Sequence, residues 1–117
     1  MLSLPGGVSI YVHTRPTDLR KSFDGLCGII RSDFGQEPLD GSLFLFLNGR
    51  RDRIKLFLCD HDGLAIWYKR LETGTFESIR GAGGAASVEI DATALALLLG
   101  GVSIESAQRR KRYRQAS

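Results

Sequence analysis

Apolar positions repeat with a period of about two along the centre of the chain. Residues 42–47, 53–60 and 64–71 each carry the short apolar or alternating pattern of a β-strand. The dipeptides Asn48-Gly49 and Asp62-Gly63 separate these segments, and both tolerate the positive φ angles of tight hairpin turns. The pattern therefore predicts a three-stranded antiparallel meander.

A further strand and two helices are expected around this meander. Apolar and polar positions alternate in residues 8–13, which predicts a strand that joins the edge of the meander. Thr17 or Asp18 can cap the helix that follows, and Asp91 can cap a short second helix that ends at Gly100-Gly101. The first helix carries one apolar stripe at helical spacing, made of Leu19, Phe23, Leu26, Cys27 and Ile30.

Both faces of the predicted meander are apolar. On its first strand, leucines at alternate positions share one face and phenylalanines share the other. One helix before the meander cannot cover both faces, so the second face is expected to meet the C-terminal helix, another chain, or both. A homodimer is one such arrangement. The residues expected to bind a partner are Phe44, Phe46 and Phe57.

These elements predict an α+β fold with a mostly antiparallel sheet of about four strands. One helix precedes the central meander and a short helix follows it. The chain of 117 residues is long enough for one domain, which we place at residues 1–108. The glycine- and alanine-rich residues 81–87 are interpreted as a linker inside this domain. Residues 109–117 are expected to form a basic, disordered tail.

The basic character of the chain comes from its last nine residues. The formal net charge is +3, but residues 1–108 hold eleven Lys and Arg against thirteen Asp and Glu, a net charge of −2. Blocks of like charge often serve as nucleic-acid-binding arms. Phosphate attraction through release of counterions is therefore expected at this tail. Its basic residues are Arg109, Arg110, Lys111, Arg112 and Arg114.

The composition places no part of the chain in a membrane or an oxidising compartment. The longest apolar runs are far shorter than the roughly 20 residues that a membrane-spanning helix needs. The N-terminus lacks the basic and apolar segments of a secretory signal. Cys27 and Cys59 are isolated in the sequence, as reduced thiols commonly are. We therefore expect a cytoplasmic protein.

Two stretches carry a resemblance to a known family. They are Asp18-Leu-Arg-Lys-Ser-Phe-Asp-Gly-Leu26 and residues 41–64, the second continuing through the segment 67–76. In these motifs the chain resembles the TnpB-type accessory protein of the insertion sequence 66 family, over roughly residues 2–105. The resemblance implies a role in DNA transposition beside a separately encoded transposase. The transposase, or another accessory protein of the same element, is then an expected partner.

A second group of basic residues lies in and after the first predicted hairpin. Segment 50–70 contains six basic residues and three acidic ones. Guanidinium groups at a turn can contact phosphate in a bidentate manner, although a solvated turn or a protected sheet edge would have the same composition. We assign nucleic-acid contact to this group, which consists of Arg50, Arg51, Arg53, Lys55, Lys69 and Arg70.

The sequence contains no convincing catalytic motif. Asp60-His61-Asp62 has residue types that bind divalent ions, but neighbouring residues at a strand end point to opposite faces, and Asp-Gly suits a turn. No pair of cysteines or histidines has the spacing of zinc ligands. We therefore expect no cofactor and no metal, and a non-enzymatic accessory factor for DNA transposition that contacts DNA, the transposase, or both. The alternatives are a pure protein-interaction module and, less favoured, a metal-dependent nuclease.

Overall fold

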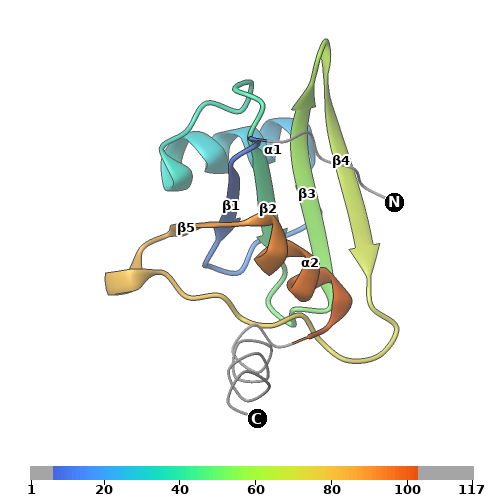
Figure 1. Cartoon of the computed structure of the whole chain (residues 1–117). Helices are drawn as coiled ribbons and strands as arrows, with labels where there is room; N and C mark the ends of the chain where they lie inside the picture. Colours follow the sequence, from blue (N-terminus) through green and yellow to red (C-terminus); the bar gives the residue numbers. More distant parts are fainter. Residues whose placement is uncertain (1–6, 103–117) are drawn as a thin grey trace.

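The computed structural model describes residues 7–102, which form one mixed five-stranded sheet with a helix on each face (Figure 1). The strand order is β4-β3-β2-β1-β5. An α+β fold is thereby confirmed. The elements along the chain are β1 (Ile10–His13), α1 (Phe23–Ile29), the π-helical turn η1 (Ile30–Phe34), β2 (Leu43–Leu47), β3 (Arg53–Asp60), β4 (Gly63–Arg70), the short 3-10 turn η2 (Ala82–Gly84), β5 (Ser87–Ile90) and α2 (Ala92–Gly100).

The central meander is confirmed nearly to the residue. Strand β3 pairs antiparallel with both β2 and β4, with Phe44 opposite Phe57 in the first pair. The positive φ angles, however, do not lie at the expected glycines. They fall at Arg51 (φ 57°) in the first connection and at His61 (φ 39°) in the second. The first connection is a five-residue loop, 48–52, and not a two-residue turn.

The sheet has five strands, one more than the expected four. Strand β5 pairs antiparallel with β1, while β1 pairs in parallel with β2. A parallel pair needs a crossover, which α1 and η1 supply. Residues 81–86 lead into β5 and are hydrogen-bonded to Thr14. The Thr14 backbone N–H donates to Ala86 O at 2.9 Å, and the Thr14 hydroxyl donates to Ala85 O at 2.6 Å.

Helix α2 covers one face of the sheet. Asp91 Oδ1 accepts a hydrogen bond from the Ala94 backbone N–H at 2.7 Å, which confirms the expected cap. Gly101 ends the helix in the left-handed conformation. Leu95 and Leu98 pack in the core on this face. The other buried members of this cluster are Ile10, Val12, Leu43, Leu45, Leu47, Ile54, Leu56 and Phe76.

Helix α1 and the turn η1 cover the opposite face. The phenylalanines expected to bind a partner, Phe44, Phe46 and Phe57, are each 0% exposed and lie in this second cluster with Leu26 and Ile30. Phe34 of η1 contacts the first two edge-on, with ring centroids 5.2 and 5.4 Å apart. The chain itself therefore covers both sheet faces over these residues.

The first helix starts later than its apolar stripe predicts. Helix α1 begins at Phe23, after the N-cap residue Ser22, whose side chain makes no capping bond. The expected caps are therefore wrong: the Thr17 hydroxyl bonds to His13, and Asp18 bonds to Arg20. Phe23 is 41% exposed, so it contributes little to the core. None of the helices within residues 7–102 has the length and apolarity to cross a membrane.

Candidate nucleic-acid interface

The sheet topology gathers three loops at one end of the sheet. Strands β1 and β2 are parallel, so the segments that follow them, 14–20 and 48–52, leave at the same end. Strand β4 also ends there, because it runs antiparallel to β3, and the segment 71–80 follows it. We call this region, with Arg53, Lys69 and Arg70 at its strand ends, the basic end.

The basic end differs in charge from the rest of the body. Residues 14–20, 48–53 and 69–80 together hold eight basic and four acidic residues, a net charge of +4. The remainder of residues 7–102 holds three basic and eight acidic residues, a net charge of −5. The fold therefore separates charge that the sequence distributes over three segments.

The side chain of Asn48 organises the loop 48–52. Its Oδ1 accepts from the backbone N–H groups of Asp52 at 3.1 Å and Arg53 at 3.0 Å. Its Nδ2 donates to Asp52 Oδ1 at 2.6 Å, which lowers the pKa of that carboxyl. Asn48 thus adds side-chain hydrogen bonds to the backbone bonds of the loop, which run from Arg51 N–H to Asn48 O at 3.1 Å and from Asn48 N–H to Arg53 O at 3.3 Å.

Backbone contacts hold the loop from its other side. The Phe76 N–H donates to Arg51 O at 2.6 Å, and the Leu71 N–H donates to Asp52 O at 2.7 Å. Phe76 is 2% exposed and is part of the core under α2. Arg51 therefore sits on a rigid support although its own φ angle is left-handed, a conformation unusual for a residue with a side chain.

The six basic residues expected between 50 and 70 do not all reach the surface. Lys55 is 8% exposed, and its Nζ donates to Lys21 O at 2.8 Å and lies 4.9 Å from the ring centroid of Tyr68. Its ammonium group is satisfied inside the chain. The other five are exposed: Arg50, Arg51, Arg53, Lys69 and Arg70.

Carboxylates neutralise only part of this exposed group. Arg70 Nη2 contacts Glu72 Oε1 at 2.9 Å, and Arg53 Nη1 donates to the Tyr68 hydroxyl at 3.2 Å. Within residues 7–102 no acidic side chain lies within ion-pair distance of the other three, which are Arg50, Arg51 and Lys69. Their charge is available to a ligand.

The five exposed cations do not share one sheet face. Residues that oppose each other in an antiparallel pair point to the same face. Arg70 opposes Arg53, and both belong to the α1 face, on which Phe57 also lies. Lys69 opposes Ile54 and belongs to the α2 face. The basic end therefore presents cations around the end of the sheet instead of across one surface.

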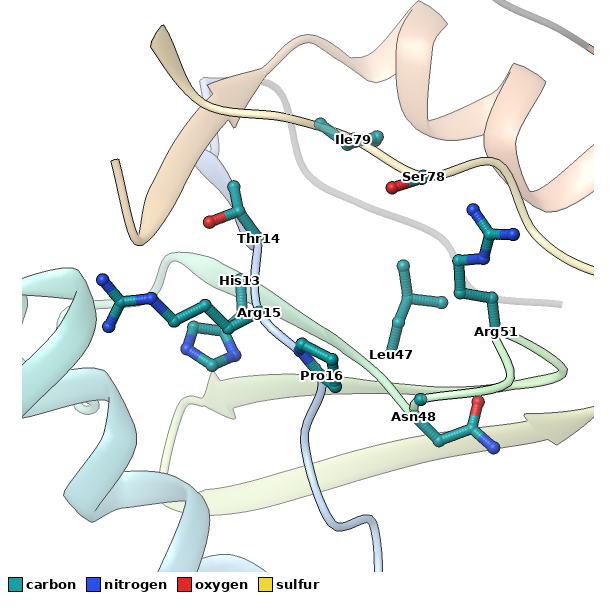
Figure 2. Close-up of a pocket in the computed structure, with 10 residues that line it drawn as sticks. His13, Thr14, Arg15, Pro16, Leu47, Asn48, Arg51, Ser78 and Ile79 are labelled. Atoms are coloured by element: carbon teal, nitrogen blue, oxygen red, sulfur yellow. The ribbon is translucent and has the colours of Figure 1, made fainter. Parts of the chain in front are cut away.

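Several hollows open at the basic end. Figure 2 shows one of about 240 Å³, with Arg15 and Arg51 on opposite sides of it. Another, of about 660 Å³, we call the tyrosine groove. It is lined by Thr17, Asp18, Leu19, Arg20, Asn48, Gly49, Arg50, Asp52, Arg53 and Tyr68.

Arg15 and Arg20 reach the basic end although the sequence did not assign them to it. The side chain of Arg20 is 91% exposed, and its Nη2 lies 2.7 Å from Asp18 Oδ2. Hydrogen bonds from the Arg20 side chain and backbone lower the pKa of Asp18 to about 2. Only the parallel pairing of β1 with β2 brings this segment beside the arginine loop, and that pairing has no local sequence signal.

A buried histidine positions the segment 14–20. His13 is 5% exposed, its Nδ1 lies 2.9 Å from the Thr17 hydroxyl, and its Nε2 lies 2.8 Å from Asp33 Oδ2. The bond to His13 lowers the pKa of Asp33. Thr17 also donates its backbone N–H to Leu47 O at 2.8 Å. This network fixes the start of the segment against β2 and η1.

The opposite end of the sheet carries the hairpin tip 60–63. Asp60, His61 and Asp62 are all exposed, and His61 Nε2 is 3.9 Å from Asp60 Oδ1. Across residues 7–102 no group of three His, Cys, Asp or Glu side chains is placed to hold a metal ion. Cys27 is buried and Cys59 partly buried, both as free thiols.

A family model described as IS66 Orf2 like protein matches residues 8–109. This match covers both the sheet and the arginine loop. The chain belongs to the IS66 Orf2-like family. Membership associates it with transposition of an insertion sequence, in an accessory role. The resemblance seen in the motifs of residues 18–26 and 41–64 is thereby confirmed.

Two proteins of Sinorhizobium fredii (strain NBRC 101917 / NGR234) are similar to this IS66 Orf2-like protein. The protein y4jC is 33% identical over 76 residues, which are 65% of this chain and 65% of the relative. The protein y4hO is 33% identical over 101 residues, which are 85% of this chain and 86% of the relative. No solved structure matches the chain.

Proposed function

We propose that this IS66 Orf2-like protein is a non-enzymatic accessory factor that binds DNA through its basic end and its C-terminal tail. The observation that carries the proposal is the separation of charge, with +4 at the basic end and −5 in the rest of residues 7–102. Such a polar distribution orients a molecule in the field of a polyanion, because the acidic remainder is repelled.

The side chains of the basic end are suited to binding phosphate groups. Its exposed cations are mostly arginines, whose planar guanidinium groups bind phosphate through two parallel hydrogen bonds. Asn48 and Phe76 hold the backbone of the loop 48–52 from both sides, so little backbone entropy of the loop remains to be lost on binding.

The tail would add affinity without sequence preference. Residues Arg109 to Arg114 lie outside the residues that the structure describes, and their contribution follows from charge alone. Five cations that neutralise five phosphates change the slope of log K against log salt by roughly 4.5 on duplex DNA. The folded basic end then fixes orientation, and the tail increases the residence time on DNA.

The test is the salt dependence of duplex DNA binding for matched charge reversals. Arg51→Glu alters an exposed loop arginine that does not line the tyrosine groove and forms no ion pair within residues 7–102, whereas Arg31→Glu makes the same change in charge at η1, away from the basic end. We expect a smaller slope for R51E, by roughly 0.9 for one lost phosphate contact, and little change for R31E. Removal of residues 109–117 is expected to reduce the slope by up to roughly 4.5.

The alternative function, a module that binds only protein, leads to a different expected result. Its association with the transposase would survive conversion of Arg50, Arg51 and Arg53 to glutamate, and the purified protein would show no salt-dependent affinity for duplex DNA. Recovery of the transposase from cells that carry the intact element, with and without nuclease treatment, separates the two functions. Equal slopes for wild type, R51E and the truncated chain would contradict the proposal.

A further inference from the structure

The tyrosine groove contains one aromatic ring among charged and polar groups. Tyr68 is 47% exposed and lies on β4, one of the two edge strands of the sheet. Three arginines and two carboxylates line the same hollow, together with the amide of Asn48. An exposed tyrosine beside arginines is the arrangement by which proteins stack bases and hold the attached phosphates.

The ring of Tyr68 is fixed before any ligand arrives. Lys55 Nζ lies 4.9 Å from its ring centroid, and Arg53 Nη1 donates to its hydroxyl at 3.2 Å. Lys55 is in turn held by its bond to Lys21 O. A ring that is held by two contacts yet nearly half exposed loses less conformational freedom than an unsupported ring when a planar group stacks on it.

The charges of the groove decide between paired and unpaired DNA. Arg20, Arg50 and Arg53 face Asp18 and Asp52, which leaves a net charge of only +1. The backbone of a duplex presents phosphates alone, and the two carboxylates would repel it. An unpaired nucleotide presents one phosphate, a flat face and a base edge with both donors and acceptors, so it suits a lining of both signs.

We propose that the tyrosine groove binds unpaired nucleotides of a DNA strand, with a base stacked on Tyr68 and its phosphate near Arg50 and Arg53. This inference rests on the proposed DNA contact and narrows it to single-stranded or distorted DNA at this site. Duplex segments beyond the groove would contact the remaining cations of the basic end. An RNA strand offers the same base and phosphate chemistry, so the experiment includes one.

The experiment measures the affinity of the full chain for a mixed-sequence DNA 20-mer, its duplex and the same sequence as RNA. We expect tighter binding to the single strand than to the duplex, and no preference for RNA. Tyr68→Ala is expected to weaken single-strand binding by about 5- to 100-fold, the range for loss of one stacked base. Tyr68→Phe retains the ring and should bind nearly as wild type.

Two controls keep the outcome interpretable. Phe23→Ala removes an aromatic ring of similar exposure that does not line the groove, and it should leave affinity unchanged. The second control uses a strand that contains 2-aminopurine, whose fluorescence falls when the base stacks. It reports stacking on the wild-type protein, so it remains informative if the Y68A variant does not fold.

Equal or tighter binding to duplex, an unaltered affinity for folded Y68A, or a clear preference for RNA would overturn the assignment and leave the proposed DNA contact standing. Failure to bind any of the three nucleic acids would overturn both this assignment and the proposed DNA contact.

Discussion

Arg53 and Arg70 stand directly opposite each other in the register of β3 and β4, with both side chains on the α1 face of the sheet. Like charges at such a position repel each other and weaken strand pairing. Each guanidinium has a local partner, Tyr68 for Arg53 and Glu72 for Arg70, which offsets part of the repulsion. A phosphate between the two would offset more of it.

Removal of one of these two charges is therefore expected to stabilise the fold and weaken DNA binding together. In Arg70→Gln the cross-strand repulsion disappears, so the melting temperature should rise slightly, while the salt slope on duplex DNA should fall by roughly 0.9. Lys69→Gln is the matched control, because Lys69 opposes Ile54 and has no cation across the strand pair. A lower melting temperature for R70Q than for K69Q would contradict this account.

The phenylalanines on the α1 face should act on stability and not directly on partner binding. Phe57 is 0% exposed and packs against Phe44 with ring centroids 6.3 Å apart. Phe57→Ala is therefore expected to lower the free energy of unfolding by about 3–5 kcal/mol, measured by urea denaturation. Phe23→Ala, at a 41% exposed ring, should change it far less. Similar effects of the two substitutions would show that α1 does not cover this face.

The titration of Asp18 tests the turn that carries Arg20 into the tyrosine groove. Its folded pKa is about 2, below the ordinary value near 3.8, chiefly because the Arg20 side chain donates to it. A depressed pKa means that this contact stabilises the fold above about pH 4 and that the contribution is lost as the pH falls towards 2. NMR titration of the Asp18 carboxyl should show this midpoint.

The control for this titration is substitution of the donor. In Arg20→Ala the Asp18 midpoint should return towards its ordinary value, whereas Arg31→Ala, at an ion pair with Glu37, should leave it unchanged. A normal midpoint in the wild-type chain would show that the Asp18–Arg20 turn does not persist in solution. Asp18 and Arg20 would then not line the tyrosine groove as they do in the structure.

Much of the fold follows from local patterns, because strands and caps are read from neighbouring residues. Residues 53–60 form a strand with the expected bounds, and Asp91 caps α2 as expected. Strand β5 has no clear signal in the sequence, because it is only four residues long and follows a glycine-rich segment. The parallel pairing of β1 and β2 depends on a crossover, which no short pattern specifies.

The same limit applies to the candidate site. The arginines of the loop 48–52 are adjacent in sequence, so they could be found without the fold. Arg15 and Arg20 join them only through the parallel strands. In the sequence Lys55 is equivalent to its basic neighbours, but alternation along β3 places it on the α1 face, where Lys21 O accepts a hydrogen bond from its Nζ. A count of charges in the sequence therefore locates the loop 48–52, whereas the pairing of the strands determines which basic side chains are exposed at the basic end.

The left-handed backbone of Arg51 gives a way to separate the conformation of the loop from its charge. At φ 57° a side chain is disfavoured, and glycine adopts this conformation without steric strain. Arg51→Gly and Arg51→Ala remove the same guanidinium, so both should reduce DNA affinity and the salt slope equally. Only the alanine variant retains the strain.

The glycine variant should consequently be more stable than the alanine variant, by about 1 kcal/mol in the free energy of unfolding. This is the strain relieved less the extra freedom that glycine gives the unfolded chain. Urea denaturation measures the difference, and the DNA titration is repeated on both proteins. If affinity differed between two equally charged variants, the path of the loop would determine binding. If alanine were the more stable, the support from Asn48 and Phe76 would not be holding Arg51 in a left-handed conformation.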